Sequence, residues 1–125
     1  MNVTISSFGY LHGAPPAAHL TFDLRHHFRD PHVSPELRHM TAHDSEVRRA
    51  VLGTPGIPAL VEAIADAVVA YRRGPGGQDV TVAVGCAGGR HRAAVMAEAI
   101  RTALADEDVR ATVVHRDLGK PVVDR

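Results

Sequence analysis

The stretch VTVAVGCAGGRHRAAVMAEAI, residues 80–100, constrains the fold more than any other part of the chain. Its first residues are β-branched and predict a buried strand, whereas the small residues from Ala93 to Leu104 favour a helix. Two glycines and a basic cluster separate these elements. Such a strand, glycine turn and helix, followed by another strand, implies parallel pairing through a right-handed crossover. We therefore expect an α/β fold, a single three-layer-type domain with a small, mainly parallel sheet flanked by helices.

Apolar periodicity predicts the other elements of the chain. Alternating or β-branched residues predict strands within VTISSFGYL, HLTFDLR and VRATVVHRDL, residues 3–11, 19–25 and 109–118. Apolar residues three and four apart predict a helix opened by Thr54 and Pro55, and a shorter one capped by Asp44 or Ser45 and ended by Gly53. Residues 26–43 have neither period and are too long and polar for an ordinary connector, which is typical of functional or disordered loops. The tail GKPVVDR has no clear period.

Composition limits the class of protein. The 125 residues suit one domain, and 14 Lys and Arg against 14 Asp and Glu give no net charge, so any anion binding must be local. The single cysteine excludes an intrachain disulfide and favours a reducing, cytoplasmic compartment. We find no signal peptide and no apolar run near the roughly 20 residues of a membrane span. The nine histidines match no metal-site spacing, so we expect neither a metal nor a cofactor.

The glycine turn has the character of a phosphate cradle. Ligands of open α/β sheets bind at the carboxyl ends of strands, where helix N-termini present unpaired N–H groups. Glycines let backbone amides converge on an oxyanion, and arginine grips phosphate with a bidentate fork. The candidate phosphate-binding residues are Cys86, Ala87, Gly88, Gly89, Arg90, His91 and Arg92. The alternative is a tight turn with solvated arginines, and the absence of a Walker A pattern excludes a P-loop NTPase.

Cys86 and Arg92 raise a second possibility, because a cysteine, five residues and an arginine is the spacing of cysteine-dependent phosphatases. In those enzymes a thiolate at a helix N-terminus attacks phosphorus. Against this interpretation, Gly85 precedes the cysteine where tyrosine phosphatases have His, and Ala93 follows the arginine where they have Ser or Thr. The general acid would be one of three aspartates, namely Asp23, Asp30 and Asp44. The other interpretation of Cys86 is a small buried thiol at a strand end.

Several segments in the same order resemble the C-terminal domain of the RNase adapter family RapZ. The glycine loop resembles that family's Gly-Cys-Thr-Gly-Gly, Lys or Arg, His-Arg motif. The segments SFGYLHGAPPAAHLTFDLR, DPHVSPELRHMTAHD and VVHRDL match further motifs, so the resemblance covers nearly the whole chain. It implies a fold similar to part of phosphofructokinase, a domain that binds glucosamine-6-phosphate, and a stand-alone module without the kinase-like N-terminal domain. It also implies homo-oligomerisation.

The resemblance further implies which residues bind the ligand. Gly88 and Arg92 would hold the phosphate, and Ala87 stands where the family has Thr, so one hydroxyl ligand is lost. The sugar-binding candidates are Asp23, Arg25, His32, Arg38, Thr41 and Asp44. Asp23 could alternatively form an internal salt bridge with its neighbour Arg25.

The family's C-terminal domain also binds small RNA, so the resemblance implies RNA or a protein as a further partner. Arg90, Arg116 and Lys120 are the candidate RNA contacts. Zero net charge predicts only a small contribution from counterion release. Three functions therefore remain: a non-enzymatic regulatory domain for a sugar phosphate, a Cys86-dependent phosphate ester hydrolase, and an RNA-binding adaptor without a small-molecule ligand.

Overall fold

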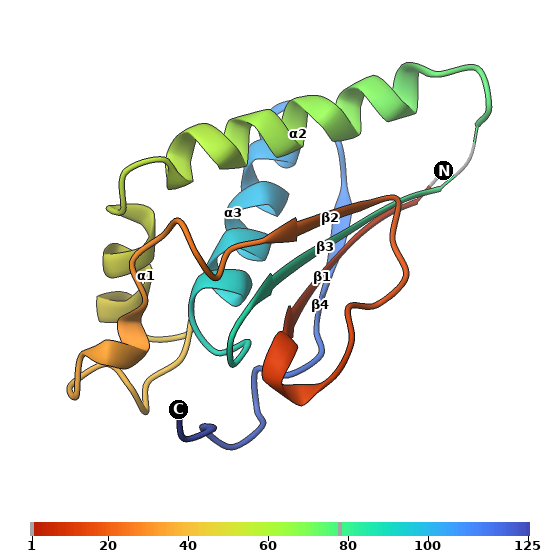
Figure 1. Ribbon diagram of the computed structural model, residues 1–125. Coiled ribbons are helices and arrows are strands. Elements are labelled where there is room, and N and C mark those ends of the chain that lie inside the picture. Colours follow the sequence, from red (N-terminus) through yellow and green to blue (C-terminus); the bar gives the residue numbers. More distant parts are fainter. Residues whose placement is uncertain (1, 78) are drawn as a thin grey trace.

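The computed structural model describes residues 2–77 and 79–125 and contains one four-stranded sheet (Figure 1). The strands are β1 (Val3–Gly9), β2 (Leu20–Asp23), β3 (Val80–Cys86) and β4 (Ala111–His115), in the order β2-β3-β1-β4. All three pairings are parallel. The predicted α/β fold with a parallel sheet is therefore confirmed.

The register of the two central strands places their carboxyl ends level with one another. Val3 of β1 pairs with Val80 of β3, and Gly9 pairs with Cys86. Asp23, the last residue of β2, pairs with Gly85. The segments that follow β1, β2 and β3 therefore leave the sheet along one edge, the edge at which ligands bind in open α/β sheets.

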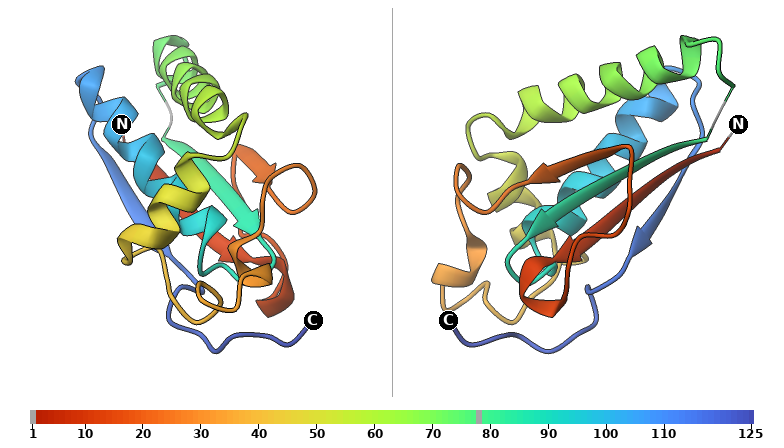
Figure 2. Two further views of the ribbon diagram at one scale, coloured as in Figure 1. Left: turned by 90° about the vertical axis from the view of Figure 1, so that its left-hand side faces the viewer. Right: turned by 45° about the vertical axis from the view of Figure 1, so that its right-hand side comes forward.

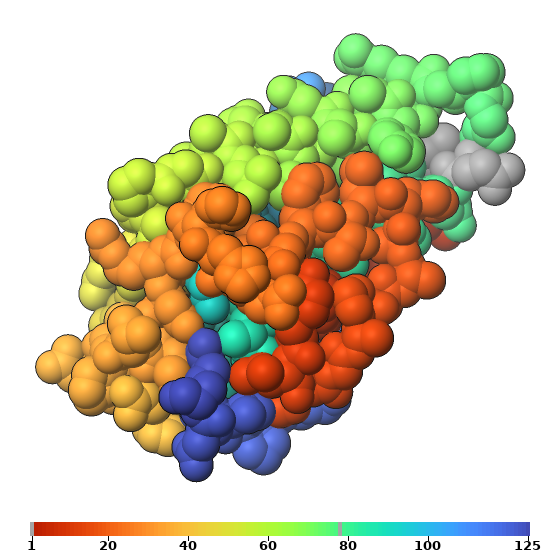
Figure 3. Space-filling model, viewed as in Figure 1, coloured from red at the N-terminus to blue at the C-terminus, as the bar shows by residue number. Residues whose placement is uncertain are grey.

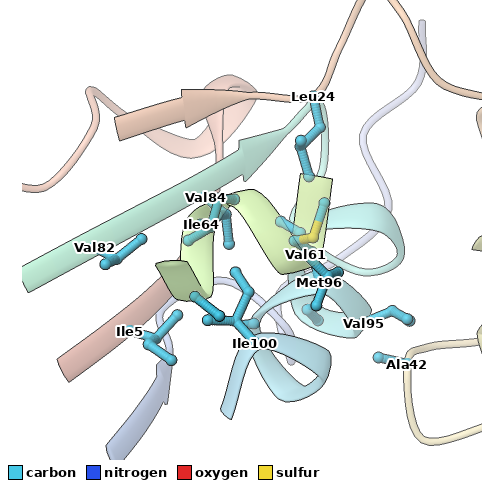
Figure 4. Close-up of a cluster of buried hydrophobic side chains, with 14 of the residues drawn as sticks. Ile5, Leu24, Ala42, Val61, Ile64, Val82, Val84, Val95, Met96 and Ile100 are labelled. Carbon is cyan, nitrogen blue, oxygen red and sulfur yellow. The ribbon is translucent and has the colours of Figure 1, made fainter. Parts of the chain in front are cut away.

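The helices α1 (Ser45–Leu52), α2 (Ile57–Arg73) and α3 (Arg92–Asp106) pack together on one face of the sheet (Figure 2). Figure 4 shows Ile5, Val82 and Val84 of the strands facing Ile64 of α2 and Ile100 of α3. Because side chains alternate along a strand, the opposite face carries a different set, in which Thr4, Ser6, Thr112 and Val114 are partly or fully exposed while Phe8 and Ala83 are buried. Over the described residues the domain thus has two layers, where we expected three.

Helix and strand boundaries differ slightly from the predicted ones. The helix α2 begins at Ile57 rather than near Thr54, because Gly56 takes the left-handed conformation with φ of 92°. Thr54 instead donates its hydroxyl to the carbonyl of Ala50 in α1, at 2.8 Å. The strand β1 stops at Gly9, since the next residues form the short 3-10 helix η1 (Tyr10–His12).

The helix α2 has 17 residues. No single helix of the described residues is long and apolar enough to cross a membrane. The pair α1 and α2 reaches the required length and composition only together, across a bend of 83°.

Candidate functional site

The glycine turn between β3 and α3 is built around the sulfur of Cys86. Its Sγ accepts the backbone N–H of Gly89 at 3.3 Å and that of Ala93 at 3.4 Å, so the buried thiol closes the turn and holds the first residues of α3. Gly89 has φ of 78°, and a Cβ there would lie 2.9 Å from the backbone nitrogen of Gly9. Only glycine fits this close approach to the end of β1.

Arg92, the first residue of α3, is almost fully buried, with 2% of its surface exposed. Its Nη1 donates to the carbonyls of Leu24 at 3.0 Å, Arg25 at 3.1 Å and Phe28 at 3.3 Å. Its Nη2 lies 3.2 Å from Oδ2 of Asp30. The guanidinium therefore fastens the segment after β2 to the start of α3, and its Nε has no hydrogen-bond partner among the described residues.

Arg90 and His91 fasten a second segment, residues 39–42, to the same turn. Arg90 donates to the carbonyl of His39 at 2.6 Å and to that of Lys120 at 3.1 Å. His91 is 4% exposed, and its Nε2 lies 2.8 Å from the carbonyl oxygen of Met40. Burial lowers the pKa of His91 despite this bond, which favours the neutral ring.

These segments enclose a small pocket in front of the glycine turn. Three parts of the chain line it: the long loop with the 3-10 helix η2 (Pro31–Val33), the glycine turn, and the C-terminal segment. The space left inside is about 10 Å³, roughly the room of one water molecule. Figure 3 shows the C-terminal segment in dark blue against the orange long loop, beside the cyan glycine turn. The lining residues are Asp30, His32, Cys86, Gly88, Arg90, His91, Arg92, Val122, Val123 and Arg125.

Cations outnumber anions in the pocket lining. Three arginines and two histidines face one carboxylate, that of Asp30. Burial raises the pKa of Asp30, but hydrogen bonds from Arg125 and from the N–H of His32 outweigh it and leave the pKa below its ordinary value. Burial and nearby Arg125 lower the pKa of His32. The lining is therefore positive even with both histidines neutral, and it suits an anion.

The sugar-binding candidates do not all gather at this pocket. His32 lines it, and Arg38 supports it by donating from Nε to the carbonyl of His32 at 2.9 Å. Thr41 and Asp44 instead close the turn before α1, where the N–H of Thr41 donates to the Asp44 carboxylate at 2.9 Å.

Asp23 ends β2 and Arg25 follows it. Both lie outside the pocket lining, where they form an ion pair with 2.8 Å between Oδ2 and Nη2. The hydrogen bond from Arg25 is the main cause that lowers the pKa of Asp23 to about 2. The guanidinium of Arg25 also stacks 3.7 Å from the ring centroid of Tyr10. The structure thus has the internal salt bridge that was the alternative for Asp23.

The candidate RNA contacts are engaged with other protein groups. Arg116 donates to the carbonyl of Ala14 at 2.6 Å and pairs with Asp117 at 2.9 Å. Lys120 pairs with the same carboxylate at 2.7 Å. Arg90 holds the carbonyls described above, so all three cations contribute to the packing of this edge.

The pocket also contains residues that the sequence did not indicate as ligand-binding. Asp30 was considered only as a general acid, and Val122, Val123 and Arg125 belong to a tail without a recognisable pattern. The charge of Arg125 was the only available signal. Its partner, Asp30, is 95 positions away in the chain, and no local sequence pattern indicates a contact between residues so far apart.

The amino-acid sequence matches a known protein family over most of its length. Residues 1–119 match the family described as the RapZ C-terminal domain. A nucleotide-binding protein of Mycolicibacterium vanbaalenii is 42% identical over 122 residues, which are 95% of this chain and 38% of that protein. A nucleotide-binding protein of Streptomyces coelicolor is 41% identical over 124 residues, 96% of this chain and 41% of that protein.

The chain thus spans about two fifths of the length of these curated relatives. The match covers every element described above, from β1 to β4, together with the glycine turn and the long loop. The chain therefore belongs to the RapZ C-terminal domain family, as the resemblance predicted.

Proposed function

We propose that this domain is a non-enzymatic regulatory module that binds a phosphorylated small molecule, with glucosamine-6-phosphate as the first ligand to test. The observation that carries the proposal is the pocket at the β3–α3 turn, where three arginines and two histidines face a single carboxylate. A phosphate there would lie at the N-terminus of α3, where unpaired backbone N–H groups and the helix dipole favour an anion. The relatives' name, nucleotide-binding protein, is compatible with a phosphate-bearing ligand.

The chemistry of the pocket divides between its two sides. The amides of the turn and Arg92 would face the phosphate oxygens, while His32 on the long loop would meet the sugar hydroxyls. Ala87, which stands in the position of the family's Thr, offers no hydroxyl. We expect this difference to weaken ligand affinity or to alter ligand choice, since a lost hydrogen bond costs about 1 kcal/mol.

Isothermal titration calorimetry tests the proposal with four compounds: glucosamine-6-phosphate, glucose-6-phosphate, GTP and inorganic phosphate. Gly88 lines the pocket, and a Cβ added to it meets no protein atom within 4 Å, so Gly88→Ala keeps the fold. We expect the added methyl to obstruct the backbone amides and weaken binding about tenfold, or about 1.4 kcal/mol. Gly76→Ala, equally free of clashes but far from the pocket, is the matched control. Folded protein that binds none of the four compounds would refute the proposal.

One observation favours a second candidate, the hydrolysis of phosphate esters by Cys86. Its sulfur accepts two backbone N–H groups at the start of α3 and lines the pocket together with Asp30. In this mechanism the thiolate attacks phosphorus while the ester P–O bond breaks and Asp30 gives a proton to the leaving oxygen. Water then releases phosphate from the cysteine. Hydrogen bonds keep the pKa of Asp30 below its ordinary value, so this carboxylate is poorly suited to donate a proton, which favours the binding function instead.

Turnover of p-nitrophenyl phosphate separates the two candidates. The hydrolase candidate requires activity that Cys86→Ser abolishes, because a serine hydroxyl is a far weaker nucleophile than a thiolate. If the native protein shows no turnover, or if Cys86→Ser turns over the substrate at the native rate, the hydrolase candidate is excluded.

A further inference from the structure

The C-terminal segment, residues 121–125, runs back across the carboxyl edge of the sheet after β4 and ends beside the long loop (Figures 1 and 2). We call these five residues the strap. Its half-buried Val122 and Val123 line the pocket. At its end, Nη1 of Arg125 lies 2.7 Å from Oδ2 of Asp30, the same oxygen that lies 3.2 Å from Nη2 of Arg92.

With the strap in this position the pocket admits no sugar phosphate. The remaining space is about 10 Å³, and Cys86 in the lining is 2% exposed. A phosphate group is larger than the one water molecule that such a space holds. A phosphorylated ligand therefore fits only after part of the lining has moved.

The strap is held more weakly than the chain before it. Lys120 is anchored, because it pairs with buried Asp117 and its carbonyl accepts from Arg90. Within the described part of the chain, by contrast, residues 121–125 make no backbone–backbone hydrogen bond. Segments with few buried contacts and few hydrogen bonds open at the lowest free-energy cost. The contact between Arg125 and Asp30 is accordingly the latch, and the anchored Lys120 marks the hinge.

The charges of the latch link its opening to an anionic ligand. A phosphate at the glycine turn attracts Arg92 and repels Asp30, so it competes with this carboxylate for its arginine partners. Asp30 is held in the pocket by those same cations and by the N–H of His32. An arriving anion therefore weakens the contact that keeps the strap closed.

We propose that residues 121–125 are a removable lid over the pocket, latched by the ion pair between Arg125 and Asp30. As a gate for a phosphorylated ligand, the lid rests on the function proposed above. As a moving part of the fold, it is testable without any ligand, because Cys86 is the only cysteine and lies beneath it.

The test measures the rate at which 5,5′-dithiobis(2-nitrobenzoic acid) labels Cys86 in the native protein and in four variants. We expect Arg125→Ala to speed labelling about fivefold, as expected for losing one ion pair at the upper end of the surface range. Deletion of residues 121–125 should speed it further, and Arg125→Lys should stay close to the native rate. Arg101→Ala on α3 is the control, since Arg101 is exposed and lies outside the pocket lining. Circular dichroism and thermal unfolding confirm that each variant is folded.

Native-like labelling of folded Arg125→Ala and of the folded deletion variant would overturn the lid. Calorimetry with glucosamine-6-phosphate and inorganic phosphate, run on the same proteins, reports separately on the proposed function. Faster labelling without ligand binding would retain the lid and refute the binding function. Ligand binding with an unchanged labelling rate would support the binding function and refute the lid.

Discussion

Arg92 and Asp117 are both almost fully buried, and each is surrounded by partners of complementary charge or polarity. Buried charges are tolerated only with such compensation. Arg92 donates to backbone carbonyls and Asp30, and Asp117 accepts from the N–H of Gly9 at 2.7 Å and pairs with two cations. The charged side chains of Arg92 and Asp117 therefore belong to a network of ion pairs and hydrogen bonds at the carboxyl edge of the sheet.

Asp117 should make stability depend on acid pH. Burial raises its pKa, but hydrogen bonds from Arg116, Gly9 and Lys120 outweigh this and lower the pKa to about 2. The folded pKa lies below the unfolded one, so the contribution is complete above about pH 4 and is lost as pH falls toward 2. A shift of this size corresponds to about 2 kcal/mol.

Urea unfolding of the native protein and of Asp117→Asn at pH 7, 4 and 2.5 measures this contribution. We expect a difference of about 2 kcal/mol in the free energy of unfolding at pH 7, shrinking as the pH falls below 4. Asp66→Asn, on an exposed face of α2, serves as the control. A difference that stays constant down to pH 2.5 would contradict the prediction.

The two glycines of the turn should respond differently to the same substitution. Gly89 has positive φ and touches the backbone of Gly9, so Gly89→Ala should lower the free energy of unfolding by about 2 kcal/mol or more. A Cβ on Gly88 meets no atom within 4 Å, so Gly88→Ala should change stability by less than about 1 kcal/mol. Denaturant unfolding of both variants checks this contrast, and equal effects would disprove it.

At the scale of elements, the start of α3 joins three parts of the chain. Cys86 ties it to β3, Arg92 to the segment after β2, and His91 to the loop before α1. Helix starts leave N–H groups without intrahelical partners, and here a thiol accepts one of them, that of Ala93. The position of the candidate site therefore depends on one helix N-terminus.

Arg92→Lys tests this junction. A lysine keeps the positive charge, but its compact ammonium group cannot replace the planar guanidinium that contacts three carbonyls and Asp30 at once. Some of these buried acceptors therefore lose their donor. We expect the free energy of unfolding to fall by about 2–3 kcal/mol and residues 25–43 to become more sensitive to protease. Arg101→Lys on the exposed side of the same helix should change it by less than about 0.5 kcal/mol. Similar losses of unfolding free energy in both variants would show that the contacts of Arg92 do not stabilise the fold more than an exposed arginine does.

The whole molecule carries equal numbers of acidic and basic residues, and its cations at the carboxyl edge are engaged in internal contacts. Affinity for RNA rises with the number of phosphates that free cations neutralise. While Arg90, Arg116 and Lys120 keep their internal contacts, these three candidate cations therefore contribute little to RNA affinity.

Filter binding to a structured RNA at several salt concentrations tests the adaptor function. We expect weak binding, with a slope of log K against log salt shallower than about −2, as for two or three phosphate contacts. Arg116→Ala and Lys120→Ala should therefore change the slope very little. A slope of about −4 or steeper in the native protein would restore RNA binding as a leading function.

The amino-acid sequence by itself determined the elements and the position of the glycine turn. Periods of two and of three to four residues reflect contacts between near neighbours, so they predicted the four strands and three helices to within a few residues. The glycine turn also was evident, because a strand, two glycines and a helix are adjacent in the chain. The family followed from several such motifs in one order.

Only the tertiary structure decided which faces are covered and which residues share the pocket. Periodicity shows that a helix has an apolar face but not which side of the sheet it covers, so the helices form one layer where two were expected. Likewise, Arg125 reaches Asp30 across 95 positions, and Arg92 is occupied by carbonyls from another segment. Such contacts depend on how the elements pack, and no local stretch of sequence contains that information.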